Sequence, residues 1–201
     1  MTNSEKVIEA ASKIQTLIEE LSNDALAKLF DQFSDRYFTT PASSKIEHHS
    51  AYPGGLAVHS LAVTEMMFKL VDVLKDEKEF PTAITNLDVI IVGLLHDLGK
   101  IGTAEGVLYY IPQTSEWHRK NLGQMYKYNE NLKDGLTHAQ RSIRLLQQYG
   151  FQLSDSQYIS VLQHDGLYVE SNRTPEIMFS EDKLARITHF ADSYTCFVNK
   201  I

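Results

Sequence analysis

A histidine–aspartate pair near the middle of the chain, His96-Asp97, has the side chains that bind divalent transition metals. His59 precedes the pair and Asp192 follows much later in the chain, so a fold that gathers these segments would assemble nitrogen and oxygen ligands in one site. Lys100 comes directly after the pair and could stabilise negative charge that develops on a substrate. This combination predicts a metal-dependent hydrolase.

The ligand types indicate which metal the site would bind. Mixed imidazole and carboxylate ligands suit manganese, iron, cobalt, nickel or zinc better than calcium or magnesium, which prefer an all-oxygen shell. The sequence does not choose among these five metals. Cys196 lies one helical turn after Asp192, and we expect it to be a small buried residue and not a ligand.

The elements that must position these residues are predicted to be mostly helical. Residues 39–55 are rich in Ser, Pro, Gly and Thr and predict a loop, followed by a helix from about 55 to 75 with His59 in its first turns. The stretch 87–95 is apolar and β-branched, so its pattern allows a buried strand or a buried helix. Further helices are expected at about 137–149, 154–164 and 182–199.

The first 33 residues carry apolar side chains at three- and four-residue spacing, which predicts two amphipathic helices. Their apolar faces would cover the domain's own core, bind a partner helix or form a dimer seam. Between residues 102 and 131 aromatic residues are interspersed with polar ones, which predicts an ordered loop with a short β-hairpin.

Several motifs are similar to those of the HD-domain superfamily. These are Gly-Gly-Leu-Ala-Val-His-Ser at residues 54–60, Val-Gly-Leu-Leu-His-Asp-Leu-Gly-Lys at 92–100 and Phe-Ala-Asp-Ser at 190–193. The segment His-His-Ser-Ala-Tyr-Pro-Gly-Gly-Leu at 48–56 resembles HD domains of exoribonucleases and conjugative relaxases. Residues 117–126 and 163–168 resemble stand-alone HD hydrolases of bacteria and bacteriophages. The resemblance covers roughly residues 46–197.

The resemblance implies an all-α fold, a single HD-domain helical bundle spanning 1–201. Residues 46–197 would form its core and residues 1–45 an N-terminal helical extension packed on it. It also implies that 87–95 is a helix, with His96-Asp97 at its C-terminal end beside a stop at Gly99. Two-metal members place extra histidines where this chain has His138 and His164. If both bind, Asp97 can bridge two ions about 3.5–4 Å apart; if neither does, the site holds one ion.

Candidate catalytic residues are therefore Asp97, Lys100 and His164. Six residues are expected near the substrate: His49 and His118 as proton donors or phosphate ligands, Trp117 as a stacking surface, and Arg119, Lys120 and Arg141 as phosphate-binding cations. Each has an ordinary alternative. The three cations would otherwise be solvated surface charge, and the aromatic ring would be part of the packing.

The composition of the chain limits its domain number, its partners and its cellular location. The chain has 201 residues, 43% hydrophobic and 22% charged, which suits one domain with a single core. The net charge of −7, without a basic block, disfavours binding to an extended duplex and favours a small phosphorylated substrate such as a nucleotide. No apolar run approaches the ~20 residues that span a bilayer. The single cysteine and the lack of a secretion signal predict a cytoplasmic protein, with homo-oligomerisation left open.

Three functions are compatible with this sequence. The first is a phosphohydrolase that cleaves a nucleotide or related phosphoester with metal-activated water, including a cyclic-nucleotide phosphodiesterase or a nuclease acting on single-stranded 3′ ends. The second is a di-iron oxygenase, because some HD-fold proteins hold two irons with the same six-ligand pattern. The third is a regulatory module with a non-catalytic metal site.

Overall fold

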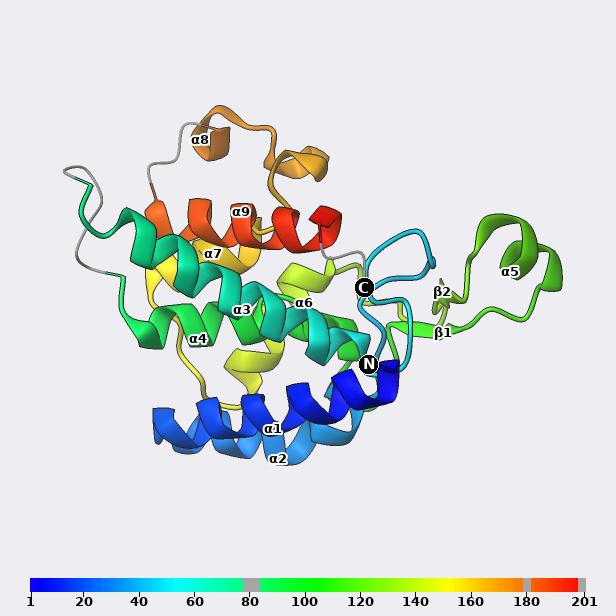
Figure 1. The fold of residues 1–201 in the computed structure, drawn as a ribbon. Helices are drawn as coiled ribbons and strands as arrows, with labels where there is room; N and C mark the ends of the chain where they lie inside the picture. The colour runs from blue at the N-terminus through cyan, green and yellow to red at the C-terminus, as the bar shows by residue number, and fades with distance from the viewer. Residues whose placement is uncertain (78–83, 179–181, 199–201) are drawn as a thin grey trace.

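The computed structural model describes residues 1–77, 84–178 and 182–198 (Figure 1). In these residues the fold is all-α with one two-stranded antiparallel hairpin, as predicted. The elements in chain order, with η for a 3₁₀-helix, are α1 Asn3–Leu21, α2 Asp24–Tyr37, α3 Gly55–Leu74, α4 Asn86–Leu95, η1 Leu98–Ile101, β1 Tyr110–Pro112, α5 Glu116–Leu122, β2 Tyr126–Tyr128, α6 His138–Gln148, α7 Asp155–Gln163, η2 Gly166–Tyr168, η3 Glu170–Asn172, α8 Pro175–Met178 and α9 Lys183–Val198. Residues 179–181 and the predicted helix end at residue 199 lie outside the described residues.

The helices α1 and α2 run side by side along one edge of the bundle, drawn in blue in Figure 1. A capping box between Thr2 and Glu5 begins α1. The apolar stripes of both helices are buried in the core of this chain, with Ile14 and Phe33 no more than 1% exposed. Tyr37, the last residue of α2, donates a hydrogen bond of 2.7 Å to the carbonyl oxygen of Leu94. Of the three predicted roles for these stripes, the structure shows the first.

The helix α4 is buried along almost its whole length, which explains its continuous apolar sequence. A capping box between Thr85 and Asp88 begins the helix, so the segment is a helix and not a strand. The helix ends at Leu95, and His96 occupies the position just past that end.

Gly99 does not end this helix, so its predicted role as a stop is wrong. It lies inside η1, where a Cβ atom would meet the backbone oxygen of His138. Its N–H donates a 2.7 Å hydrogen bond to the Ser142 hydroxyl. Glycine is required here because α6 packs directly against the backbone of η1.

The predicted β-hairpin is confirmed, with Tyr110 opposite Tyr128 in an antiparallel register. The chain between its strands forms α5, a short helix that the sequence analysis did not predict. Ser115 caps the start of α5, and Gly123, in the left-handed region, ends it. In Figure 1 the hairpin carries α5 away from the bundle.

The remaining long helices were predicted within a few residues of their observed ends. Thr137 and Ser154, each with a glutamine three residues later, form capping boxes that begin α6 and α7. The helix α9 packs against α3 and α7, which closes the bundle over the end of α4. No helix within the described ranges combines the length and apolarity needed to cross a membrane.

Candidate metal centre

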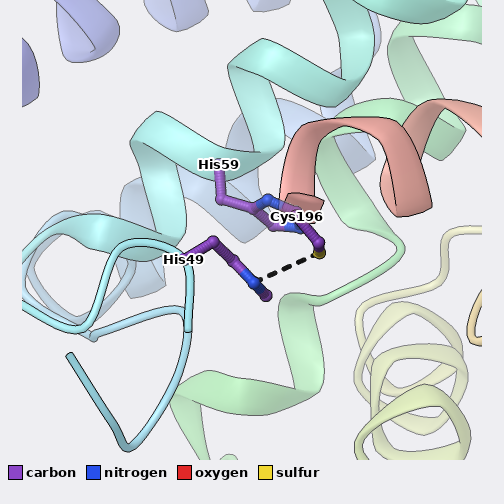
Figure 2. A group of neighbouring side chains, drawn as sticks. All are labelled: His49, His59 and Cys196. Atoms are coloured by element: carbon purple, nitrogen blue, oxygen red, sulfur yellow. Dashed lines mark hydrogen bonds between the residues drawn. The ribbon is translucent and has the colours of Figure 1, made fainter. Parts of the chain in front are cut away.

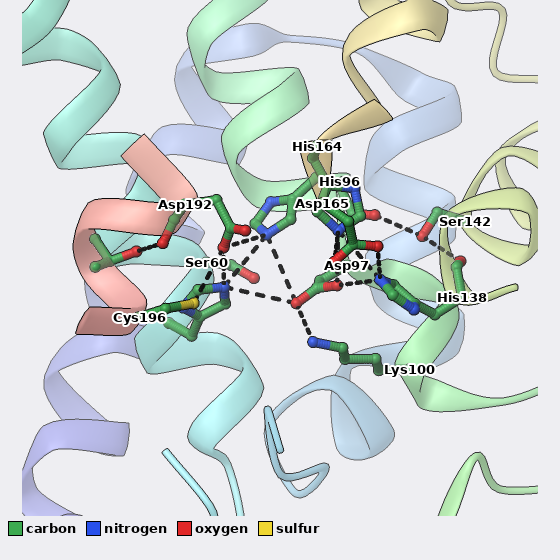
Figure 3. A network of polar contacts seen from close by, with 12 residues as sticks. Ser60, His96, Asp97, Lys100, His138, Ser142, His164, Asp165, Asp192 and Cys196 are labelled. Carbon is green, nitrogen blue, oxygen red and sulfur yellow. Dashed lines mark hydrogen bonds and ion pairs between the residues drawn. The ribbon is translucent and has the colours of Figure 1, made fainter. Parts of the chain in front are cut away.

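The six predicted metal ligands meet in one buried cluster (Figure 3). They come from five segments: His59 from α3, His96 and Asp97 from the end of α4, His138 from the start of α6, His164 from the end of α7 and Asp192 from α9. His96, Asp97 and His164 are at most 1% exposed. Segments distant in the sequence therefore converge on a single polar centre inside an apolar bundle.

One carboxylate oxygen of Asp97 faces a first pair of histidines. Its Oδ2 lies 3.6 Å from Nε2 of His59 and 3.6 Å from Nε2 of His96. Asp192 adds a second carboxylate, with Oδ1 at 3.0 Å from His59 Nε2 and 3.9 Å from His96 Nε2. These four residues form the first half of the centre.

The other oxygen of Asp97 faces a second pair. Its Oδ1 lies 3.3 Å from Nε2 of His138 and 3.4 Å from Nε2 of His164. Asp165 completes this half, with Oδ2 at 3.2 Å from His138 Nε2. Asp97 therefore stands between two groups of potential ligands, each with two imidazoles and a further carboxylate.

Asp165 was not among the predicted ligands, although the sequence contains a signal for it. His164-Asp165 repeats the His96-Asp97 doublet, and both doublets follow the last turn of a helix. Because the chemistry of the two doublets is the same, a search for repeated metal-binding dipeptides would have found Asp165.

Hydrogen bonds to the backbone fix the ring orientation of the doublet histidines. His96 donates from Nδ1 to the carbonyl oxygen of Gly93 at 2.9 Å, and His164 donates from Nδ1 to that of Val161 at 2.8 Å. Since Nδ1 carries the proton in each neutral ring, Nε2 directs its lone pair into the centre. Metal-binding histidines commonly have this arrangement, with the far nitrogen bonded to a carbonyl.

The centre contains polar atoms that need a further partner. Asp97 Oδ1 is buried without a well-formed hydrogen bond from any described residue, and its nearest donors are the Nε2 atoms of His138 and His164 at 3.3 and 3.4 Å. The Nε2 atoms of His138 and His164 face each other at 3.1 Å, and those of His59 and His96 at 3.4 Å. Facing nitrogens repel unless a proton or a cation lies between them. Imidazole and carboxylate donors of this kind fit one or two divalent transition-metal ions.

The charges of the cluster also favour a cation. Burial opposes ionisation of Asp97, but Lys100 and the neighbouring histidines together outweigh burial and hold the pKa of that carboxyl well below its usual range. Burial likewise opposes ionisation of Asp165 and Asp192, and the neighbouring histidines lower the pKa of both. Three ionised carboxylates therefore surround the centre at neutral pH.

The two doublet histidines differ in protonation when no metal is bound. Burial lowers the pKa of His96 to about 4, so its ring is neutral at pH 7. Burial acts in the same direction on His164, but the charges of Asp165 and Asp97 outweigh it and raise the pKa of His164 to about 9. A metal ion in the second half of the centre would therefore displace a proton.

Lys100 lies at the edge of the centre. Its Nζ is 2.6 Å from Asp97 Oδ2, the oxygen that faces the first pair of histidines. Burial would lower the pKa of this amine, but the Asp97 carboxylate outweighs burial and raises it, so the ammonium keeps its charge.

A cavity of about 590 Å³ opens beside the centre. Its wall consists of Glu47, His48, His49, Asp165, Tyr168, His189, Asp192, Ser193, Cys196 and Phe197. Asp165 and Asp192 belong to both the wall and the metal-binding cluster, so the cavity reaches the ligands directly. Its volume is in the range of small-molecule sites.

Of the predicted substrate-binding residues, His49 lies near the centre. Its ring centroid is 4.3 Å from that of His59, and it lines the cavity. Trp117, His118, Arg119 and Lys120 do not reach the centre, because all four lie on α5 beyond the hairpin (Figure 1). The Trp117 side chain is 59% exposed, and Lys120 forms an ion pair with Glu116.

Arg141 is neither a phosphate-binding cation nor a solvated charge. It is 1% exposed, and its guanidinium binds both carboxylate oxygens of Asp134, at 2.7 and 2.9 Å. It also donates to the carbonyl oxygen of Leu136 and lies over the ring of Tyr109. Its contacts join α6 to the preceding loop, so its role is structural.

The centre as a whole has groups that lie close enough to hold a metal ion, next to a cavity whose volume suits a small molecule. Asp97 is the one residue whose two oxygens face both halves of the described cluster. Comparison with models of protein families, with curated proteins and with solved structures gave no match.

Proposed function

We propose that the protein is a metal-dependent phosphohydrolase of the HD-domain superfamily, which cleaves a phosphoester of a nucleotide or related small molecule. One observation carries the proposal. The two oxygens of the buried Asp97 carboxylate each face a pair of imidazole nitrogens, with further carboxylates on both sides. A carboxylate between two ligand groups is the arrangement that holds a pair of ions for in-line displacement at phosphorus.

The residues divide into two ligand groups that share Asp97. His59, His96 and Asp192 would hold one ion, and His138, His164 and Asp165 would hold the other. Bound divalent ions would activate the attacking water and polarise the phosphoryl oxygens. The carbonyl oxygens of Gly93 and Val161 keep His96 and His164 in the orientation that this requires.

Lys100 supplies the fixed positive charge of the site. Its ammonium lies within 2.6 Å of Asp97 and is available to a phosphoryl oxygen once metal ions take over the negative charge of that carboxylate. Such an interaction strengthens as charge develops in the transition state. Lys100 is therefore the residue of this chain that we expect to stabilise the transition state directly.

The cavity favours a small organic phosphate. The rings of Tyr168 and Phe197, with centroids 6.3 Å apart, form an aromatic part of its wall and would contact a base or another apolar group. Burial, with the nearby charges of His59 and Lys100, lowers the pKa of His49 to about 2, so its ring is neutral. A neutral imidazole there would orient the substrate, either by a hydrogen bond or through an ion bound to it.

A substrate panel with matched variants tests this proposal. Purified protein is analysed for metal content and assayed for phosphate or nucleotide release from nucleoside mono-, di- and triphosphates, cyclic nucleotides and short single-stranded oligonucleotides. We expect bound transition metal and metal-dependent cleavage of one of these classes. Asp97→Asn should reduce both metal affinity and cleavage by more than about 100-fold. Asp35→Asn, at an exposed position of α2, should change neither.

Other outcomes would overturn the proposal in different ways. Two bound irons that react with dioxygen, without cleavage of any phosphoester, would identify an oxygenase. Bound metal with neither activity would leave a regulatory metal site. Cleavage that persists in Asp97→Asn would exclude the bridging role assigned to this carboxylate.

A further inference from the structure

Figure 2 shows a second group of donor side chains, His49, His59 and Cys196, which adjoins the metal centre on the cavity side. His49 Nε2 lies 3.7 Å from the Cys196 sulfur, and Asp192 Oδ1 lies 3.6 Å from the same sulfur. Cys196 follows Asp192 by one turn of α9, so the two side chains lie on one face of that helix. His49 approaches them from the loop before α3.

The distances between these donors match the edges of a tetrahedral metal site. With ordinary zinc bond lengths, tetrahedral geometry places an imidazole nitrogen and a thiolate sulfur about 3.6 Å apart, and a carboxylate oxygen and a sulfur about 3.5 Å apart. The observed separations of 3.7 and 3.6 Å are close to both values. Both separations from the Cys196 sulfur are therefore compatible with an ion bound to that sulfur, with His49 and Asp192 as its other ligands.

The loop that carries His49 is held in place before any ion binds. Ser50 adopts a positive φ of 47°, and its carbonyl oxygen accepts a 3.1 Å hydrogen bond from the N–H of Ala42. A Cβ atom at Gly55 would meet this same carbonyl oxygen. Because the loop packs closely on the start of α3, His49 is a preorganised donor.

We propose that His49, Cys196 and Asp192 form a further metal site, which takes a thiolate-binding ion such as zinc and shares Asp192 with the neighbouring centre. Oδ1 of Asp192 faces both His59 of the neighbouring centre and the Cys196 sulfur, so this carboxylate would be shared between the two sites. Thiolate and imidazole donors select zinc, iron or cobalt over magnesium and calcium. The sequence-based expectation that Cys196 is not a ligand is replaced by this assignment.

The location of the site determines its role. All three donors line the cavity of about 590 Å³, so an ion held by them faces the space that a substrate would occupy. Three protein ligands leave a position for water or a substrate oxygen, as in catalytic zinc sites. This role rests on the proposed phosphohydrolase function, whereas the ion binding itself does not.

X-ray absorption spectroscopy on the intact protein tests the site without reference to activity. The chain has a single cysteine, so any cysteine sulfur bound to the metal must come from Cys196. Zinc-loaded protein under reducing conditions should show a sulfur neighbour at about 2.3 Å. Cobalt-loaded protein should show a thiolate-to-cobalt charge-transfer band. Full loading of the histidine ligands with no sulfur neighbour would overturn the proposal.

Variants then define the ligand set. Cys196→Ser and His49→Gln should each bind one ion fewer than the native protein, with an unchanged circular dichroism spectrum. His118→Gln, which alters a histidine of α5, should keep the native stoichiometry. If both variants kept every ion, His49 and Cys196 would be excluded as ligands.

The same measurements separate this inference from the proposed function. A sulfur neighbour together with no phosphoester cleavage would support the site and contradict the phosphohydrolase. In the opposite outcome, Asp97→Asn would lose cleavage, whereas Cys196→Ser would keep full cleavage and the native number of bound metal ions. That result would support the phosphohydrolase and overturn the site.

Discussion

The imidazole rings of His96 and His164 lie 4.8 Å apart, centroid to centroid, and are held in the same way. Each follows the end of a helix, donates from Nδ1 to the carbonyl oxygen three residues earlier, and is followed by an aspartate and a 3₁₀-helix. The two doublets are therefore copies of one local structure. They approach the same centre from the ends of α4 and α7.

Lys100→Met should separate metal binding from catalysis. The ammonium competes with a metal ion for Asp97 Oδ2, so its removal should tighten metal binding by about tenfold. The same change removes positive charge from the transition state and should lower kcat by about 10²–10³-fold. Isothermal titration with Mn²⁺ or Zn²⁺ and steady-state kinetics measure the two effects. Lys133→Met, on an exposed loop, serves as the control, and an unchanged kcat would exclude Lys100 from catalysis.

Metal affinity should increase with pH up to about 9. The charges of Asp165 and Asp97 outweigh burial and raise the pKa of His164 to about 9, so below that pH a proton competes with the ion. One competing proton weakens binding by about tenfold for each pH unit below 9. Competition with a chelator at several pH values measures this slope, and His164→Gln should flatten it. A native affinity that does not vary between pH 6 and 9 would contradict the assignment of His164 as a ligand.

The same shift affects the metal-free fold. Because the pKa of His164 in the folded protein lies above the ordinary histidine value of 6.5, the charged ring stabilises the fold below pH 6.5. That stabilisation should be lost as the pH rises through about 9. Urea denaturation of the metal-free protein at pH 6 and pH 9.5 measures the difference, and equal stability of native and His164→Gln proteins at both pH values would contradict it.

Arg141→Met should destabilise the fold and leave substrate binding unchanged. The substitution leaves the Asp134 carboxylate and the Leu136 carbonyl without their partner, at a cost of about 2–4 kcal/mol in the free energy of unfolding. Urea denaturation measures the loss, and KM measures substrate binding. Arg144→Met alters an exposed arginine of the same helix and should have little effect. An increase in KM at native stability would restore Arg141 as a substrate ligand.

Gly99→Ala should lower both the stability of the fold and the affinity for metal, although Gly99 is not itself a ligand. The added Cβ would meet the backbone oxygen of His138, so η1 and α6 must separate, at a cost of about 1–3 kcal/mol. Because His138 moves with this backbone, metal affinity should fall as well. Gly106→Ala is the comparison: its φ of +95° is strained for alanine, but no described atom lies within 4 Å of the new Cβ. It should lower stability alone, and equal metal affinity in both variants would contradict the packing argument.

The sequence predicted the parts of this protein that obey periodic or chemical rules. Apolar spacing located the long helices, and the similarity to HD-domain motifs indicated the histidines and aspartates that meet in the buried cluster. The sequence could not predict where α5 lies. Trp117 and its neighbours are close to His96-Asp97 in sequence, but a hairpin of three-residue strands places them away from the centre. Arg141 was misjudged because its partner, Asp134, lies in an irregular loop.

The hydrogen bond from Tyr37 to Leu94 links the first helices to the metal centre, since Leu94 lies only two residues before His96. Without α1 and α2, a buried carbonyl in the last turn of α4 would lose its partner, Tyr37, and the core would lose the apolar side chains of Ile14 and Phe33. Residues 1–45 and the remainder of the chain should therefore melt together, in one cooperative calorimetric transition, and added metal should raise the temperature of the whole transition.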